Sequence, residues 1–287
     1  MTKPPRRVTV MINGPLRVGK TRLAATFPRV RFISDATEGG YETIRNMAAT
    51  DEGRAWFFEP DVVPQVIAVE SGAEMTRAIE QTKLDVQRFP GQILTLVIDS
   101  LTFLADTHFA HMLKVEKANP QTRSGEADTR KLYGNLWTFL RSTMIKVHEI
   151  PINIVWIALE KDNEYGCGIN IAGRAAEVLP AAVDYIFYQH AYRPDKDSPL
   201  VFETRTKRFG RHLAGSRDEG RVPDPLPQCS YIPFAEAGGF CPNPETFVKL
   251  PNGQLPPFKL SDEKSTTAGP VKAPAKSPAG DSPVIKK

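Results

Sequence analysis

The sequence is poor in the features that mark secreted, disulfide-bonded or membrane-spanning proteins. Its 287 residues contain three cysteines, Cys167, Cys229 and Cys241, and no CxxC pair or Cys/His cluster. This spacing indicates neither a disulfide framework nor a structural zinc site. No apolar run approaches the ~20 residues that span a bilayer, and the short apolar stretch at residues 8–12 cannot form the core of a signal peptide. These absences predict a cytoplasmic protein without a membrane segment.

Charge is also nearly balanced, with 37 Lys and Arg against 33 Asp and Glu, which gives a formal net charge of +4. Such a mildly basic chain is compatible with contact to nucleic acid but does not by itself argue for it. The length allows one large domain with a hydrophobic core and some appended segments. The charge balance therefore leaves the function to be decided by motifs.

The clearest motif is the octapeptide Gly-Pro-Leu-Arg-Val-Gly-Lys-Thr at residues 14–21, which fits the pattern GxxxxGK[ST]. In such a loop, glycines let backbone N–H groups face phosphate oxygens, the lysine reaches the β and γ phosphates, and the threonine hydroxyl binds Mg²⁺. A strand-like segment at residues 8–12 precedes it, and a helical pattern at 21–27 follows. We therefore predict an ATP-binding P-loop, with these contact residues: Gly14, Pro15, Leu16, Arg17, Val18, Gly19, Lys20, Thr21 and Arg22.

An acidic residue follows the apolar run Ile-Leu-Thr-Leu-Val-Ile at residues 93–98. Such a run is typical of a central parallel strand that is covered on both faces. Asp99 stands at the carboxyl end of this run, where a carboxylate commonly holds Mg²⁺, often through water. We expect Asp99 and Thr21 to bind the metal. The alternative is that Asp99 caps the helix that follows.

A second acidic segment, Asp-Ala-Thr-Glu-Gly-Gly at residues 35–40, follows the strand-like segment at 30–34. In an open parallel sheet, the carboxyl ends of neighbouring strands face one crevice. Glu38 is therefore the expected general base, which orients and deprotonates the attacking water, and Lys20 is its catalytic partner. Asp35 is the competing candidate for the base. A third interpretation makes Glu38 an ordinary solvated carboxylate of a turn.

Strand-like and helical segments alternate along the chain, which predicts an α/β fold with a mainly parallel central sheet flanked by helices. Residues 182–188 and 200–206 are expected to add an antiparallel extension at its C-terminal side. Residues 118–130 and 160–180 are interpreted as loops, and little regular structure is expected after Arg208. We divide the chain into a core at 1–220, a Pro/Gly-rich extension at 221–260 that packs on it, and a disordered tail at 261–287.

Four segments, taken in order, resemble the RecA-like ATPase core. They are the loop at residues 14–21, Ile-Ser-Asp-Ala-Thr-Glu-Gly-Gly at 33–40, Leu-Val-Ile-Asp-Ser-Leu-Thr at 96–102 and Leu-Pro-Ala-Ala-Val-Asp-Tyr-Ile at 179–186. The likeness is greatest to the small single-domain RecA-like ATPases of bacteriophages, which are linked to recombination and single-strand annealing. It implies Mg²⁺-dependent, DNA-stimulated ATP hydrolysis, single-stranded DNA as partner, a homo-oligomer and, for a phage protein, the host cytoplasm.

The resemblance also implies roles for particular residues. RecA-like proteins place their catalytic glutamate after the second strand, which Glu38 matches. Their DNA-binding loops correspond to the two predicted loops, whose basic residues would contact phosphates and whose Tyr165 would stack on a base. The DNA-binding candidates are Arg123, Arg130, Lys131, Lys161 and Arg174. Basic residues that reach a neighbouring subunit's γ-phosphate are expected among Arg205, Lys207, Arg208 and Arg217, with Lys207 and Arg217 as the leading candidates.

The chain departs from this family in two places. RecA has a γ-phosphate-sensing glutamine after the strand that matches residues 152–159, whereas this chain has Ala-Leu-Glu-Lys at 158–161. Coupling between ATP and DNA therefore runs differently or through Glu160. No N-terminal oligomerisation arm is evident, which leaves filament, ring and nucleotide-dependent oligomer open. The tail either recruits a single-strand-binding protein or aids solubility. A nucleotide-switched binding protein and a small-molecule kinase are the alternative functions.

Overall fold

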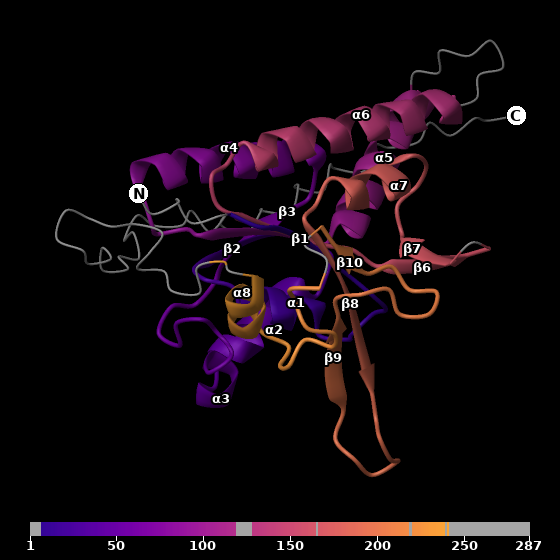
Figure 1. Cartoon of the computed structure of the whole chain (residues 1–287). Helices are drawn as coiled ribbons and strands as arrows, with labels where there is room; N and C mark the ends of the chain where they lie inside the picture. Colours follow the sequence, from indigo (N-terminus) through magenta and orange to yellow (C-terminus); the bar gives the residue numbers. More distant parts are fainter. Residues whose placement is uncertain (1–6, 119–127, 165, 218–219, 239, 241–287) are drawn as a thin grey trace, which may run out of the picture. The chain divides into compact units, whose positions relative to one another are not determined.

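One central sheet carries the fold, and a two-stranded hairpin stands apart from it (Figure 1). The computed structural model describes residues 7–118, 128–164, 166–217, 220–238 and 240. Six strands of the sheet are parallel, in the order β8–β1–β5–β4–β2–β3. Their bounds are Thr9–Asn13 for β1, Val30–Asp35 for β2, Gln65–Val69 for β3, Thr95–Asp99 for β4, Asn153–Ile157 for β5 and Tyr185–Tyr192 for β8. The predicted parallel α/β fold is confirmed.

The central strands are buried on both of their faces, which explains their continuous apolar sequences. Every residue of β1, β4 and β5 is buried. Successive side chains of a strand point to opposite faces, so Met11 joins the hydrophobic cluster on one face while Val10 and Ile12 join the cluster on the other. The sheet is therefore the middle layer of three.

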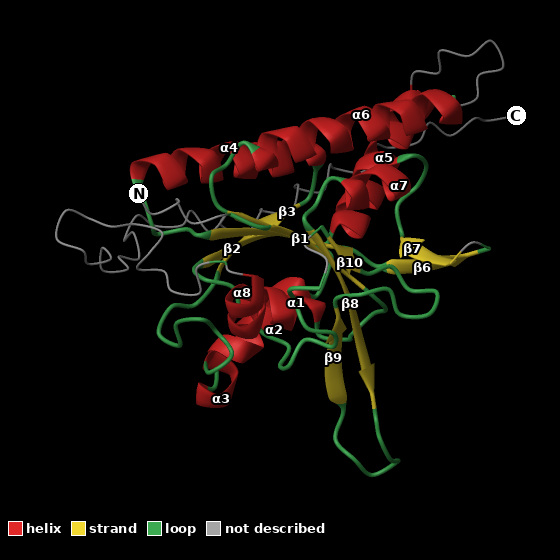
Figure 2. Ribbon diagram, viewed as in Figure 1, coloured by secondary structure: helices red, strands yellow, loops and turns green. Residues whose placement is uncertain are grey.

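Helices form the two outer layers (Figure 2). One face is covered by α4 (Gly72–Arg88), α5 (Leu101–Ala118), α6 (Thr129–His148) and α7 (Ala175–Ala181). On the other face lie α1 (Lys20–Ala25), α2 (Gly40–Ala48), α3 (Asp51–Arg54) and α8 (Tyr231–Gly238). The helices of the first layer present regularly spaced apolar residues to the sheet, such as Leu132, Leu136 and Leu140 of α6.

Both segments interpreted as loops contain regular structure. Residues 160–180 form the hairpin of β6 (Glu160–Asn163) and β7 (Gly166–Ile169), followed by α7. Helix α6 begins at Thr129, with Asp128 accepting a hydrogen bond from the Lys131 backbone at 3.1 Å. The two hairpin strands have four residues each and are rich in glycine and charged residues. Because the hairpin lies outside the main sheet, its sequence has no periodic apolar pattern from which strands could be predicted. The rest of the first loop, including Arg123, lies outside the described residues.

The antiparallel extension is confirmed in β9 (Val201–Arg205) and β10 (Gly215–Ser216), which both pair with β8. The expectation that β8 itself would join antiparallel was wrong, because β8 pairs in parallel with β1. Helix α8 was also missed. Its Tyr231, Phe234 and Ala235 pack into the second hydrophobic cluster, although flanking prolines and glycines conceal the helical pattern.

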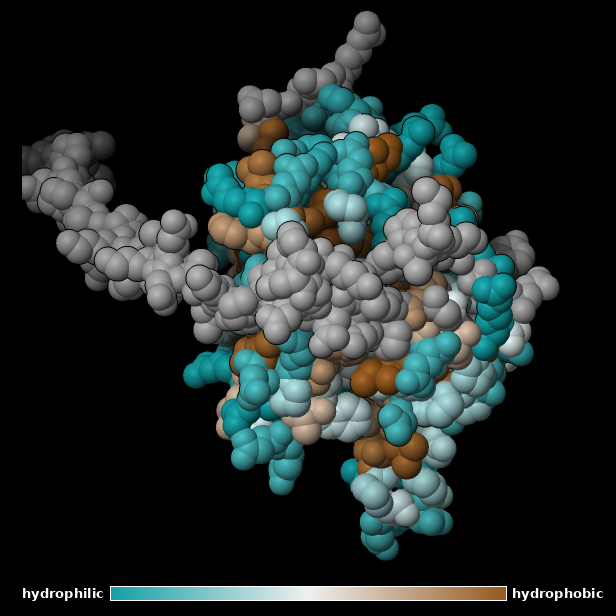
Figure 3. Space-filling view, turned by 60° about the vertical axis from the view of Figure 1, so that its left-hand side comes forward, coloured by the Kyte–Doolittle hydropathy of each residue, from teal (hydrophilic) through white to brown (hydrophobic). Residues whose placement is uncertain are grey.

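No described helix combines the length and the apolar character that crossing a bilayer requires. On the face drawn in Figure 3, hydrophobic residues form separate patches among hydrophilic ones, as is normal for a folded domain. The domain boundaries at residues 220 and 260 stay predictions, and the tail at 261–287 lies outside the described residues.

Candidate functional site

The predicted phosphate loop, metal carboxylate and general base meet at the carboxyl edge of the sheet. The loop follows β1, Asp99 ends β4, Asp35 ends β2, and Glu160 follows β5. Strand β5 lies between β1 and β4 in the sheet. The acidic residues therefore arrive beside the loop from separate strands, as the parallel topology requires.

The loop has a backbone that requires glycine at two positions. Gly14 has φ +146° and Gly19 has φ +85°, which are conformations that other residues rarely adopt. A Cβ atom on Gly14 would also lie 2.1 Å from the backbone oxygen of Gln189 on β8. The loop is therefore held tightly against the neighbouring strand. Its exposed part comprises Pro15, Leu16 and Arg17, and Val18 is buried beneath it.

Lys20 begins α1 and turns its ammonium group back over the loop. Its Nζ donates to the backbone oxygen of Gly14 at 3.0 Å and to that of Pro15. Burial lowers the pKa of Lys20 from 10.5 to about 8, although Asp99, Glu38 and Glu160 act in the opposite direction. A desolvated cation surrounded by inward-facing backbone is suited to binding a phosphate group.

Thr21 and Asp99 lie together, as a shared metal ion requires. The Thr21 hydroxyl donates to Asp99 Oδ2 at 2.8 Å. Asp99 is 1% exposed, and burial followed by the nearby Glu38 charge raises its pKa to about 7. A buried carboxylate with few compensating donors favours a bound cation.

The surroundings of Asp99 also fit Mg²⁺. The hydroxyl of Ser34 is buried and has no hydrogen-bond partner among the described residues. Ser34 pairs with Asp99 across β2 and β4. A Cβ atom on Gly40 would lie 2.7 Å from Asp99 Oδ2 and 3.2 Å from the Ser34 hydroxyl. Hard oxygen ligands around a space that only glycine leaves open suit this metal, which would neutralise phosphate charge in the transition state.

Glu38 and Asp35 differ in how their oxygens are used. Both oxygens of Asp35 are occupied: Oδ1 accepts from Thr37, and Oδ2 accepts from Thr107 Oγ1 at 2.8 Å. Glu38 Oε2 accepts from the Ser100 backbone at 2.7 Å, directly after Asp99. Burial is the main cause that raises the pKa of Glu38. Glu38 thus lies beside Asp99, and its role as the base stays a prediction, whereas Asp35 fixes the turn.

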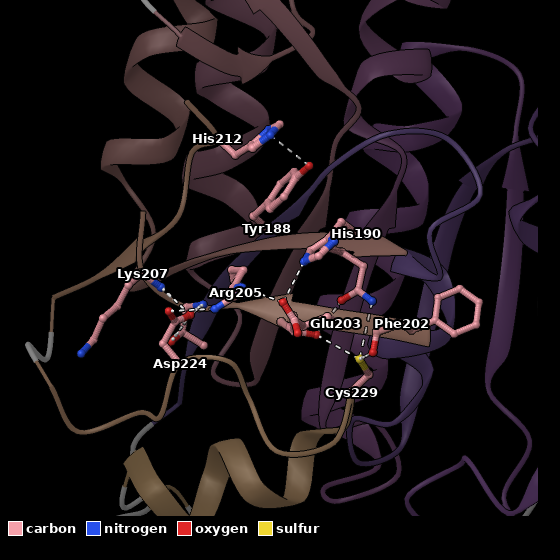
Figure 4. A network of polar contacts seen from close by, with 12 residues as sticks. Tyr188, His190, Phe202, Glu203, Arg205, Lys207, His212, Asp224 and Cys229 are labelled. Carbon is pink, nitrogen blue, oxygen red and sulfur yellow. Dashed lines mark hydrogen bonds and ion pairs between the residues drawn. The ribbon is translucent and has the colours of Figure 1, made fainter. Parts of the chain in front are cut away.

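Glu160 lies on the other side of the loop, and the structure gives it a role that sequence reading left open. Its backbone N–H donates to the Gly14 oxygen at 3.1 Å. Its carboxylate meets His212 Nδ1 at 2.6 Å. The His212 ring stacks on Tyr188, with centroids 4.1 Å apart, as Figure 4 shows for these two labelled residues. The first residue of the β6–β7 hairpin is thereby joined to the phosphate loop.

Sequence reading missed an aromatic pair beside α1. The Arg22 guanidinium lies 3.6 Å from the ring centroid of Trp56 and 5.7 Å from that of Phe202. Burial lowers the pKa of Arg22. The Phe202 ring also lies 3.0 Å from the position of a Cβ on Gly19. The Arg22 side chain is therefore engaged with aromatic rings, and its expected contact with nucleotide stays a prediction.

The four DNA-binding candidates that the structure describes are exposed but come from separate elements. Arg130 and Lys131 lie in the first turn of α6, and Lys131 forms an ion pair with Glu116 at 3.8 Å. Lys161 lies on β6, and Arg174 immediately precedes α7. Arg123 and Tyr165 lie outside the described residues.

Arg174 has neighbours that sequence reading did not select. It lines a cavity of about 410 Å³ with Trp137, Arg141, Met144, Ile145 and Val178. The cavity thus adds a second arginine and an indole ring from α6. Because three strands, β5, β6 and β7, separate α6 from α7 in the chain, no local motif could have revealed this set.

The two leading candidates for action on a neighbouring subunit differ in their contacts. Arg217 Nη2 donates to the Ala181 backbone oxygen at 2.6 Å, within its own chain. Lys207 uses its backbone N–H to contact Asp224 at 3.3 Å, while Figure 4 shows its side chain extending away from the network. Arg205 lies within ion-pair distance of Glu203 and Asp224. Lys207 is therefore the candidate whose charge is presented outward.

A phosphate loop after a buried strand, a lysine turned over it and a carboxylate beside the loop threonine define the class of P-loop ATPases. Within that class the chain belongs to the family described as AAA domain, whose model matches residues 6–214. No curated protein matches the chain closely enough to count as a relative. The family match includes every strand of the parallel sheet, and it implies ATP as the nucleotide and Mg²⁺ as its metal.

Proposed function

We propose that the chain is a RecA-type ATPase that binds single-stranded DNA and supports homologous recombination or strand annealing. The observation that carries this proposal is Glu38, which accepts from Ser100 at 2.7 Å beside the metal carboxylate. A base in this position serves hydrolysis by water, because it can orient a nucleophile at the terminal phosphate. Phage origin and action in a host cytoplasm belong to the same proposal.

Each residue of the site has a part in this reaction. Lys20 and the loop amides would hold the phosphates of ATP, and Thr21 and Asp99 would hold Mg²⁺, which would supply positive charge to offset that of the phosphates. Glu38 accepts the proton of the attacking water. The raised pKa of Glu38 makes it a stronger base than an exposed glutamate when it is ionised.

A direct path connects the loop with the proposed DNA-binding hairpin. Glu160 contacts Gly14 through its backbone, and the next residue, Lys161, is exposed on β6. Closure of the loop on ATP would therefore change the first pair of the hairpin, which joins Glu160 to Ile169. This route supports Glu160 as the coupling residue at the place where RecA has its glutamine.

The exposed charges around the hairpin suit a nucleic-acid backbone. Lys161, Arg174 and Arg141 are all exposed, and Trp137 lines the same cavity as the two arginines. Basic groups bind phosphates, and an indole ring provides a face on which a base can stack. Because such stacking tolerates every base, we expect little sequence preference.

The test is ATP hydrolysis measured with and without single-stranded DNA, together with DNA binding in ATP. We expect stimulation by DNA, and we expect the double substitution Lys161→Ala and Arg174→Ala to remove it while basal hydrolysis persists. Lys83→Ala is the matched control, because it removes an exposed lysine of α4 that pairs with Glu149. Hydrolysis that ignores DNA, with no DNA binding in ATP, would refute the recombination function.

In a homo-oligomer, Lys207 of one chain would complete the ATP site of the neighbouring chain. Lys207→Ala should lower hydrolysis strongly, because a charge supplied across an interface stabilises the transition state. Arg217→Ala should lower it less, since Arg217 already binds Ala181. Restored activity on mixing Lys207→Ala with an inactive Glu38→Gln chain would demonstrate action between copies. No restoration, with oligomers intact, would assign Lys207 elsewhere.

The alternatives are a small-molecule kinase and a nucleotide-switched binding protein. In a kinase, the hydroxyl group of an acceptor molecule would have to lie beside Glu38, where the attacking water lies in the proposed hydrolysis. Phosphorylation of a nucleoside without DNA stimulation would favour the kinase. A switch protein would keep its biological activity after Glu38→Gln, because it needs ATP binding but not turnover.

A further inference from the structure

Three metal-binding side chains of different kinds converge beside the phosphate loop. The ligand atoms of Glu160, Cys167 and His212 all lie within 4.8 Å of one another. In the part of the chain that the structure describes, this is the one group of three or more His, Cys, Asp or Glu side chains that meets so closely. The spacing of these residues in the sequence gave no sign of the group, because 44 residues lie between Cys167 and His212.

The hairpin brings two of these ligands to one face. Glu160 and Asp162 are two residues apart on β6, and Asp162 pairs with Cys167 across the ladder. Since alternate residues of a strand share a face, Glu160 and Cys167 point the same way. The Cys167 backbone also donates to the Arg211 oxygen at 2.8 Å, which fixes the adjoining His212 segment against β7.

The histidine is oriented by a neighbour in the way that metal-bound histidines are. The Tyr188 hydroxyl lies 3.4 Å from His212 Nε2, and its ring stacks on the imidazole at 4.1 Å. The other ring nitrogen, Nδ1, is 2.6 Å from Glu160 Oε1. A partner on the far nitrogen fixes the ring and the tautomer of a ligating histidine. Tyr188 is buried and packed, so this support is rigid.

We propose that Glu160, Cys167 and His212 form a site for a transition-metal ion of the zinc type. One carboxylate oxygen, one thiolate and one imidazole nitrogen are the ligand kinds that Zn²⁺ binds, and three protein ligands plus water complete its tetrahedron. The mixture of sulfur and nitrogen ligands separates this site from the oxygen ligands that Thr21 and Asp99 offer to Mg²⁺. All three side chains are partly exposed, so the fourth position faces solvent.

A comparison within the same network shows what distinguishes this site. His190 also stacks near Tyr188, with centroids 5.5 Å apart, and also pairs with a carboxylate, at 2.9 Å from Glu203. Among the described residues, the His190 pair has no cysteine within the ligand distance that defines the group. The thiol of Cys229 instead donates to the Phe202 backbone oxygen at 3.1 Å. Figure 4 shows the His190–Glu203 pair and Cys229 in one view with Tyr188 and His212.

A metal bound here would fasten three segments together. It would join both strands of the β6–β7 hairpin to the segment before β10, and it would place positive charge beside Glu160, whose negative charge raises the pKa of Lys20 against the effect of burial. Burial and the neighbouring Glu160 and Asp162 carboxylates raise the pKa of the Cys167 thiol. A divalent ion reverses that effect by stabilising the thiolate.

The experiment is a titration of the untagged, reduced, nucleotide-free protein with Zn²⁺, and separately with Co²⁺ as a spectroscopic probe. We expect one ion per chain and a thiolate-to-cobalt charge-transfer band. Cys167→Ser and His212→Ala should each abolish the band or weaken binding by at least about 10-fold, the lower end of what even a supporting residue contributes. The matched controls Cys229→Ser and His190→Ala should keep both the band and the affinity.

Two outcomes would overturn the site. Binding that stays unchanged in Cys167→Ser would show that the ion sits elsewhere, and absence of any charge-transfer band would show that Glu160 and His212 form an ion pair alone. Circular dichroism of each variant separates loss of a ligand from loss of the fold. Because the readout is metal binding, the result is independent of whether the protein hydrolyses ATP or binds DNA.

Discussion

The carboxyl edge of the sheet has two halves that treat charge in opposite ways. In the half around β2 and β4, Asp99 and Glu38 lie close together, and the pKa of each is raised. In the half around β5 and β8, Glu160 lies beside His212 and Glu203 lies beside His190. In the free protein the first half therefore leaves like charges uncompensated, whereas the second half is balanced by its own side chains and would exchange the Glu160–His212 contact for metal contacts only when the proposed ion binds.

This difference indicates which half of the edge gains more free energy when it binds a ligand. Neighbouring buried carboxylates repel each other in the free protein, and a metal ion with nucleotide relieves that repulsion. Paired groups gain less from an added ligand because their charges are already compensated. A cluster of unbalanced charge at a strand end is therefore the better indication of a catalytic centre.

We expect the largest effect from replacing Glu38, the proposed base in the half around β2 and β4. Glu38→Gln should reduce ATP hydrolysis by at least about 100-fold, the usual contribution of a general base, with ATP affinity nearly unchanged. Asp35→Asn is the control. It should retain most hydrolysis but lower the free energy of unfolding by about 1–3 kcal/mol, because Thr37 and Thr107 lose a charged acceptor. Loss of hydrolysis in Asp35→Asn alone would make Asp35 the base.

A smaller effect should follow from crowding the metal carboxylate. In Gly40→Ala, the new methyl group would lie 2.7 Å from Asp99 Oδ2. The carboxylate must shift, and we expect the Mg²⁺ concentration for half-maximal hydrolysis to rise about 10-fold, as for other residues that position a ligand. Gly39→Ala is the matched control, since nothing lies within 4 Å of its new methyl group. Equal effects of the two substitutions would refute this account of Gly40.

The smallest effect concerns stability against pH in metal-free, nucleotide-free buffer. The pKa of Asp99 is about 7 in the folded chain, against 3.8 as its ordinary value. Between these two pH values the folded state binds the Asp99 proton more tightly than the unfolded state does. The contribution of Asp99 to the free energy of unfolding is therefore largest at low pH and falls as the pH rises toward 7. Thermal unfolding should show this decline in wild type and a weaker one in Asp99→Asn. Parallel pH profiles would show that Asp99 is not the source.

The core and the centre of the site could be predicted because their signals are local. Strand β4 is continuously apolar because both of its faces are buried. The motif at residues 14–21 predicts the loop conformation because its two glycines allow positive φ angles. Glu38 could be selected because parallel strands deliver their carboxyl ends to one edge. The hydrogen-bond partners that favour Glu38 over Asp35 as the base needed coordinates, and the assignment itself stays a prediction.

The elements that escaped prediction depend on contacts between distant segments. The β6–β7 hairpin is held by Arg211, over 40 residues later than Cys167, as the backbone bond between them shows. Helix α8 is stabilised by aromatic packing, with Tyr231 and Phe27 centroids 4.6 Å apart. The Arg22–Trp56 stack likewise joins separate elements. Neither periodicity nor turn chemistry carries such long-range information.

The close approach of Gly14 to Gln189 has a mechanical consequence. The loop backbone rests on the backbone of β8, with no side chain between them to absorb a displacement. Strand β8 continues into the hairpin with β9, which extends well beyond the helices in Figure 1. We therefore expect a twist applied to that hairpin to reach the predicted phosphate loop directly through the backbone of β8.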